Sequence, residues 1–274
     1  MLHHVLSRTL SRDLEGPNLK TLVIALLCCL AVPLWAQTVE VKKTDVERLL
    51  LEWQANVPIR DELIALGFSG ENLDLASAHI KNINSDPLII SHIADLVISA
   101  YQNPEQIVVQ PDGFILPLVD QGMGHLTTTE LVYFYKVEQA ILNALPRRTC
   151  GRLVTGRLSA EHYNRSVATT AARLNTAALR EYYRLQHKAA RLGVSHSPVI
   201  LTDQRRAQIE GNIRQGVETR LVGRKDEKKL KRGLNDPKSA SISQACVLAR
   251  LYIQEALSQT GNDLRDAMMF LSLP

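Results

Sequence analysis

Hydrophobic residues recur at helical spacing between Ser159 and Leu192. Successive apolar positions are three or four residues apart, which is the period of one face of an α-helix. Ser159 is a suitable N-cap, and Gly193 is a suitable residue just past the C-terminus. The pattern therefore predicts one long amphipathic helix over residues 159–192. Its apolar positions are Tyr163, Val167, Ala171, Leu174, Ala178, Tyr182, Leu185, Ala189 and Leu192.

Shorter segments with the same period occupy most of the remaining chain. Before residue 146 they predict helices from Thr44, from about Ile59 to Gly67, over Glu71–Ile83, from Pro87 to about Tyr101 and over Thr128–Leu145. Thr127 and Glu130 have the spacing of a capping box for the last of these helices. After residue 193, helices are expected from Thr202, from about Ser243 to Ser258, and after Asn262.

One segment has a different pattern. Residues 106–110 are rich in β-branched side chains, Pro111-Asp112-Gly113 is a turn sequence, and residues 114–119 are again apolar. This order predicts a small β-hairpin near 106–119, with Pro117 limiting its second strand to a sheet edge. The expected fold is mainly α: a multi-helix bundle of helical hairpins around the long helix 159–192, with this hairpin as an insert.

The apolar run Thr21–Trp35 predicts export. Fifteen residues are too few to cross a bilayer core of about 30 Å comfortably, and they match the centre of a secretory signal peptide. We expect residues 1–36 to be a signal peptide with an N-terminal extension, cleaved near Ala36 to give a periplasmic or secreted protein. Because Leu34 is bulky for the −3 position, an uncleaved membrane anchor is the alternative.

Cleavage would remove Cys28 and Cys29 and leave Cys150 and Cys246. In an oxidising compartment, two remaining cysteines most simply form one disulfide. Two buried thiols are the alternative.

Charge divides the rest of the chain into two regions. Residues 37–145 carry 6 Lys and Arg against 15 Asp and Glu, a net charge of −9. Residues 146–274 carry 23 against 11, a net charge of +12. We therefore distinguish an acidic helical region containing the hairpin from a basic helical region containing the long helix. Such asymmetry favours either attraction between the two regions or a basic surface for an acidic partner.

Two groups of basic residues are candidates for an anionic-partner surface. One lies on the long helix, where pairing with the acidic region is the favoured interpretation and a carboxylate-rich partner is the alternative. The other lies in the basic tract Arg220–Lys238, where a solvated helix end is favoured over binding of an anionic surface. The candidate residues are Arg173, Arg180, Arg184, Lys188, Arg224, Lys225, Lys228 and Lys229.

No catalytic motif accompanies these features. The chain lacks G-x-S-x-G, Gly-rich phosphate loops, H-E-x-x-H and zinc-finger spacings. The pairs His92–Asp95 and Glu161–His162 are more typical of surface polar residues than of metal ligands. We therefore expect no catalytic residue, cofactor or metal, and export together with the absence of RNA-binding aromatic motifs disfavours nucleic acid.

The leading hypothesis is an exported, non-enzymatic interaction protein that binds a protein partner or an anionic envelope surface. Binding of that surface through the basic region is one alternative, and an envelope hydrolase or metal-dependent enzyme is another. A carboxylate gathered in a concave pocket with two or more of five histidines would favour the enzyme. These are His79, His92, His125, His162 and His187. A membrane is expected as a partner only through an uncleaved signal.

Overall fold

The computed structural model describes residues 41–102 and 115–272, and within these ranges the chain forms thirteen α-helices and no strand. The mainly α prediction is confirmed. The helices of the first region are α3 (Lys43–Ala55), α4 (Ile59–Ala65), α5 (Gly70–Asn84), α6 (Pro87–Gln102), α7 (Ile115–Met123) and α8 (Thr128–Ala144). They are followed by α9 (Arg147–Val154), α10 (Ala160–Ala171), α11 (Thr176–Ser195), α12 (Asp203–Leu221), α13 (Glu227–Asn235), the short 3₁₀ helix η2 (Pro237–Ser239), α14 (Ile242–Ser258) and α15 (Gly261–Ser272).

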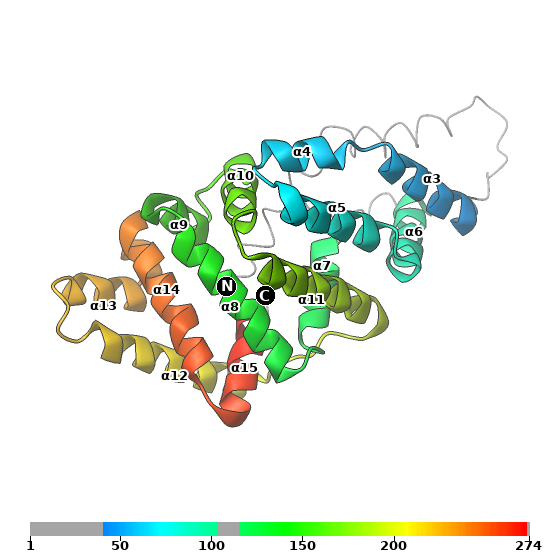
Figure 1. Ribbon diagram of the computed structural model, residues 1–274. Coiled ribbons are helices and arrows are strands. Elements are labelled where there is room, and N and C mark those ends of the chain that lie inside the picture. Colours follow the sequence, from blue (N-terminus) through cyan, green and yellow to red (C-terminus); the bar gives the residue numbers. More distant parts are fainter. Residues whose placement is uncertain (1–40, 103–114, 273–274) are drawn as a thin grey trace.

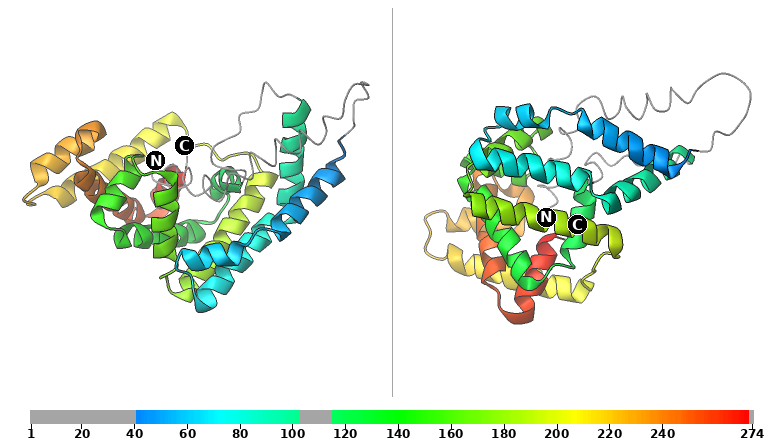
Figure 2. Two further views of the ribbon diagram at one scale, coloured as in Figure 1. Left: turned by 90° about the horizontal axis from the view of Figure 1, so that it is seen from above. Right: turned by 45° about the vertical axis from the view of Figure 1, so that its right-hand side comes forward.

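Helices α8 and α11 occupy the middle of the molecule (Figure 1). Helices α3 and α6 lie at one end, and α13 lies at the opposite end, as both Figure 1 and the left view of Figure 2 show. The main core joins buried residues of both regions, including Ile93 of α6, Phe134 of α8, Leu185 of α11 and Ile253 of α14. The acidic and basic regions therefore share one hydrophobic core.

A smaller core connects the N-terminal helices to the rest. Leu63, Phe68 and Leu73 of the α4–α5 hairpin pack with Ala171 and Leu179. No helix among the described residues is long and apolar enough to cross a membrane.

The prediction of one long helix over 159–192 is wrong. The Ser159 side chain accepts a hydrogen bond from the His162 backbone N–H, so the predicted N-cap is confirmed. Helix α10 nevertheless ends at Ala171, and α11 starts after Asn175, whose side chain accepts from the Ala178 N–H. Because the connecting turn is only a few residues long, it leaves the spacing of apolar positions almost unchanged. Periodicity therefore hides the break.

A residue from another helix satisfies the backbone at this break. The Asn72 side-chain amide of α5 donates to the carbonyl oxygens of Ala172 and Leu174, at 3.0 and 2.9 Å. These carbonyls have no intrahelical partner where a helix stops. The α10–α11 turn is thus stabilised by a contact a hundred residues away in the chain.

The predicted β-hairpin is not supported. Residues 103–114 lie outside the described residues, and residues 115–119, expected to form its second strand, belong to helix α7. Pro117 falls in the first turn of α7, where its missing N–H removes no intrahelical hydrogen bond.

Two glycines allow helices α7 and α11 to pack closely together. A Cβ atom added to Gly122 would overlap the Ala189 carbonyl, and one added to Gly193 would overlap the Leu118 carbonyl. Gly122 therefore belongs to a helix interface, and Gly193 lies inside α11, which continues to Ser195 instead of ending before Gly193. Both glycines are needed for close approach of two backbones.

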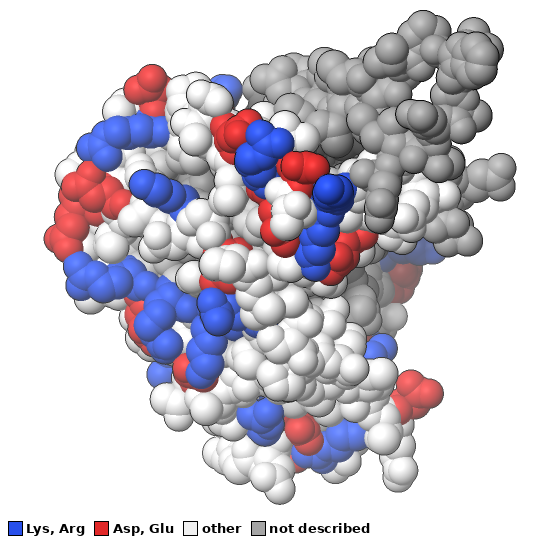
Figure 3. Space-filling view, turned by 90° about the vertical axis from the view of Figure 1, so that its right-hand side faces the viewer, with Lys and Arg blue, Asp and Glu red and all other residues white. Residues whose placement is uncertain are grey.

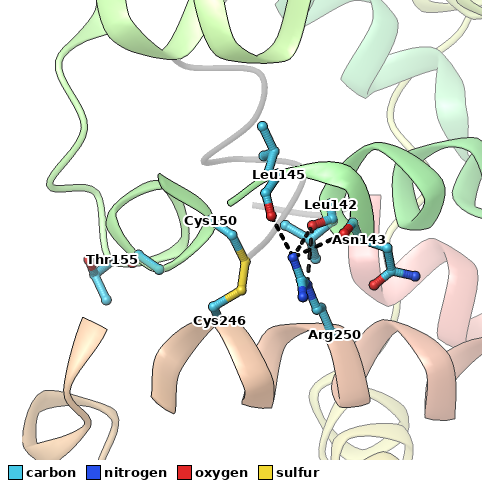
Figure 4. The surroundings of a disulfide bond; sticks show 8 residues. Leu142, Asn143, Leu145, Cys150, Thr155, Cys246 and Arg250 are labelled. Carbon is cyan, nitrogen blue, oxygen red and sulfur yellow. Dashed lines mark hydrogen bonds between the residues drawn. A yellow bond between two sulfur atoms is a disulfide. The ribbon is translucent and has the colours of Figure 1, made fainter. Parts of the chain in front are cut away.

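The predicted disulfide is present in the structure. Cys150 of α9 and Cys246 of α14 are bonded, with their Cα atoms 5.3 Å apart, and both residues are fully buried. Cys150 lies within the short helix α9. Beside the bond, the Arg250 guanidinium donates to the carbonyls of Leu142, Asn143 and Leu145, closing the C-terminus of α8 (Figure 4). The start of α8 is as predicted, with Thr127 and Glu130 forming a capping box.

Candidate functional site

The basic face of α11 is directed at acidic residues of other helices. Arg180 forms an ion pair with Glu71 of α5, and Lys188 lies 2.7 Å from Glu130 of α8. Arg184 lies 2.7 Å from Glu181 of its own helix and 3.3 Å from Glu130. Glu71 and Glu130 both belong to the acidic region. Three of the candidate cations on this helix thus hold α11 against its own chain.

Glu130 contacts both the start of α8 and helix α11. Its carboxylate accepts from the Thr127 backbone N–H at the start of α8 and from the Lys188 ammonium on α11. Burial of this side chain, which is 15% exposed, opposes ionisation, but these hydrogen bonds outweigh it and lower the pKa of Glu130 to about 2. The carboxylate is charged at neutral pH and links the cap of α8 to α11.

Asp86 is a deeply buried acidic partner of α11, with only 4% of its side chain exposed. One oxygen accepts from the backbone N–H groups of Leu88 and Ile89 at the start of α6. The other accepts from His187 Nε2 at 2.9 Å and from the Arg191 guanidinium at 2.6 Å. Burial alone would raise the pKa of Asp86, but these donors lower it below its usual range.

His79 completes a polar cluster between α5, the start of α6 and α11. Its ring stacks on Tyr183, with ring centres 4.2 Å apart and planes inclined by 5°. Desolvation, aided by the nearby charge of His187, lowers the pKa of His79 from 6.5 to about 3. The structure therefore brings two of the five histidines, His79 and His187, near each other, and His187 contacts the carboxylate of Asp86.

The other histidines lie apart from this cluster. His162 Nδ1 lies 2.9 Å from the Ser159 hydroxyl. Asp95, which lies three residues after His92, forms a 2.6 Å ion pair with Lys43. The ring of His125, in the turn between α7 and α8, faces the ring of His196, which follows α11. Within the described part of the chain, no three His, Cys, Asp or Glu side chains are grouped so as to hold a metal ion.

Helix α13 presents basic side chains in a different setting. Leu230, Gly233 and Leu234 are buried on one face, while Lys228 and Arg232 lie on the opposite face and are exposed. Local carboxylates engage two cations of the tract: Asp226 lies 3.1 Å from Arg224, and Glu227 lies 2.7 Å from Lys231.

Arg220, the first residue of the tract, forms an ion pair with the buried Glu255 of α14. The remaining cations of the tract form no ion pair with any described residue. We call this group the α13 basic surface, and its members are Lys225, Lys228, Lys229, Arg232 and Lys238. Arg173, in the α10–α11 turn, is likewise exposed and forms no ion pair in the described ranges. The eight candidate residues are thus divided: Arg180, Arg184 and Lys188 act within the fold, Arg224 pairs locally, and the other four face solvent.

The surface at the end of the molecule formed by α3 and α6 differs from the α13 basic surface. Seen from the right-hand side of Figure 1, Lys and Arg side chains lie beside Asp and Glu side chains, and a broad uncharged area separates the charged groups (Figure 3).

Comparison with protein-family models, curated proteins and solved structures gives no match. The chain's own contacts are therefore the basis for any functional conclusion. Sequence reasoning missed the Asp86 cluster, although Asp86-Pro87 carries a local signal, an N-cap residue followed by proline at the first helical position. No local signal connects Asp86 with His187.

Proposed function

We propose that this protein is exported and acts outside the cytoplasm as a non-enzymatic binding protein, using the α13 basic surface to contact an acidic region of another protein. The observation that carries the proposal is the division of basic residues described above. Cations on α11 form ion pairs with carboxylates within the fold, whereas Lys225, Lys228, Lys229 and Arg232 form no ion pair with a described residue.

Helix stability does not require the charges of the α13 basic surface. Lys228 and Arg232 are four residues apart on the exposed face, and like charges at this spacing destabilise a helix by about 0.2–0.5 kcal/mol. An external anionic group would relieve that repulsion. Because long cationic side chains on a surface raise the rate of encounter with acidic partners, the arrangement suits recognition.

Two features support export. The segment Thr21–Trp35 has the length and composition of a signal-peptide core, although it lies outside the described residues. The bond between Cys150 and Cys246 is of a kind that persists in oxidising compartments such as the periplasm or the extracellular space. Sequencing the N-terminus of the exported protein should give a start at or near Gln37, and a mass that retains Thr21–Trp35 would indicate an anchored protein.

An experiment that neutralises these charges tests the binding surface. Tagged protein is used to capture partners from its native envelope, in parallel with a Lys225→Gln, Lys228→Gln, Lys229→Gln, Arg232→Gln variant. The control, Arg173→Gln, removes an exposed cation elsewhere that forms no ion pair with a described residue. We expect a partner that elutes with salt, is retained by the control and is lost by the α13 variant.

Other results would overturn the proposal. Equal capture by both variants would exclude the α13 basic surface as the interface. Adsorption to phosphatidylglycerol vesicles that depends on these lysines, without any captured protein, would favour the anionic envelope surface instead.

The hydrolase alternative has weaker support. It would use His187 as a base oriented by Asp86, as in catalytic dyads. Asp86, however, also caps α6 and pairs with Arg191, which favours a structural role for the cluster.

A further inference from the structure

Two histidines that are distant in the sequence meet at one corner of the molecule. His125 lies in the turn between α7 and α8, and His196 is the first residue after α11. Their ring centres are 4.7 Å apart, with planes inclined by 38°. A hydrogen bond of 2.8 Å from the Gln121 side-chain amide to the His196 carbonyl ties the two connections together.

Each imidazole is oriented by a backbone carbonyl. His125 Nε2 lies 2.9 Å from the Ser197 oxygen, and His196 Nδ1 lies 3.2 Å from the Leu192 oxygen. A carbonyl oxygen can only accept, so both of these nitrogens carry a hydrogen. In the neutral rings the lone pairs are therefore on His125 Nδ1 and His196 Nε2. The N–H of a metal-binding histidine makes the same kind of bond, which sets the tautomer and holds the ring.

The separation of the rings fits two ligands of one metal ion. Zinc–nitrogen bonds are about 2.0–2.1 Å long, and a ring centre lies about 1.2 Å beyond its nitrogen, so two imidazoles on one ion have centres about 4.6 Å apart at a right angle and about 5.3 Å apart at the tetrahedral angle. The separation of 4.7 Å lies within this range. His196 is exposed and His125 half-buried, which leaves solvent access for water to complete the coordination.

From this geometry we infer that His125 Nδ1 and His196 Nε2 form a binding site for a divalent transition metal. Imidazole nitrogens suit Zn²⁺, Ni²⁺ and Cu²⁺ and are poor ligands for Mg²⁺ or Ca²⁺. With two protein ligands, water fills the remaining positions. The ion would link the α7–α8 turn to the segment after α11, at the interface where Gly122 and Gly193 bring the backbones together.

Calorimetric titration of the full, untagged chain with ZnCl₂ tests the site. The variants are His125→Gln and His196→Gln, and His162→Gln is the matched control because His162 is exposed but has no described histidine beside it. We expect one binding event that disappears in each of the first two variants and persists in the control. MgCl₂ should give no binding at this site.

A second measurement guards against misfolded variants. Zinc should raise the melting temperature of the wild type and of His162→Gln but not of either site variant, each of which should melt near the wild-type temperature without metal. The inference is overturned if zinc binding and the thermal shift are unchanged in both site variants, or if the wild type binds no zinc. Loss in only one variant also overturns it, because both imidazoles are required.

Discussion

Helices α11 and α13 both carry a dense set of basic side chains, yet their surroundings differ. On α11, Arg180, Lys188 and Arg191 each meet a carboxylate from another helix, and two of these carboxylates, Asp86 and Glu130, are largely removed from water. On α13, Lys228 and Arg232 lie opposite the buried face without a described carboxylate partner. A dense set of basic side chains therefore contributes to packing in one helix and is exposed to solvent in the other.

The comparison shows that the number of charges on a helix does not reveal their use. An exposed ion pair contributes about 0–1 kcal/mol, whereas a hydrogen bond to a charged, largely buried group contributes about 1.5–3 kcal/mol. The α11 cations matter because Asp86 and Glu130 are buried, and not because the cations are numerous.

The largest expected effect comes from removing the disulfide. Replacing Cys150 and Cys246 with Ala removes a cross-link over 96 residues of sequence. The free energy of unfolding should fall by about 2–5 kcal/mol, because the unfolded chain becomes less constrained. Hydrogen exchange should accelerate first in α9 and α14, which the bond joins, and later in α11. Equal acceleration in all three helices would contradict separate stabilisation of the α11 and α13 ends.

Removing one buried charge tests how much the carboxylates facing α11 stabilise the fold. Asp86→Asn retains a cap for α6 but removes the anion that His187 and Arg191 contact, so the free energy of unfolding should fall by about 1.5–3 kcal/mol. The control Asp95→Asn removes a carboxylate that is 60% exposed and paired with Lys43. It should cost at most about 1 kcal/mol, as measured by urea denaturation. Similar losses in both variants would refute the special role of Asp86.

Acid should weaken the α11 side before it affects the α13 basic surface. The pKa of His79 is lowered to about 3, so the unfolded state binds a proton that the folded state lacks between about pH 6.5 and 3. Stability should therefore fall as the pH drops below about 6.5. Glu130, with its pKa lowered to about 2, adds a further loss below about pH 4.5. The variant His79→Phe should flatten the pH 4–6.5 part of a plot of urea midpoint against pH, and an unchanged slope would exclude His79 as its cause.

The smallest effect is expected on α13. Replacing Lys228, Lys229 and Lys231 with Gln should change the free energy of unfolding by no more than about 0.5 kcal/mol and the melting temperature by a few degrees. Lys231 contributes only one solvent-exposed pair with Glu227. Loss of several kilocalories per mole in calorimetry would show that these lysines are docked within the fold.

Much of the helical structure follows from local signals. The side chains of Thr127, Ser159 and Thr202 accept hydrogen bonds at the starts of α8, α10 and α12, as their positions before apolar runs predict. The disulfide was also predictable, because Cys150 and Cys246 are the only cysteines outside the predicted signal segment. These inferences depend on neighbouring residues or on composition.

Contacts between distant residues decided the rest. Asn72 of α5 satisfies the carbonyls at the α10–α11 turn, and Gly122 and Gly193 allow the backbones of α7 and α11 to approach each other closely. Likewise, Asp86 receives His187 and Arg191 only once α6 and α11 are packed. Sequence periodicity by itself determined which faces are apolar and where most helices begin. Tertiary structure determined where a helix breaks and which charges are neutralised, because both depend on the donors and acceptors that packing brings within hydrogen-bonding distance.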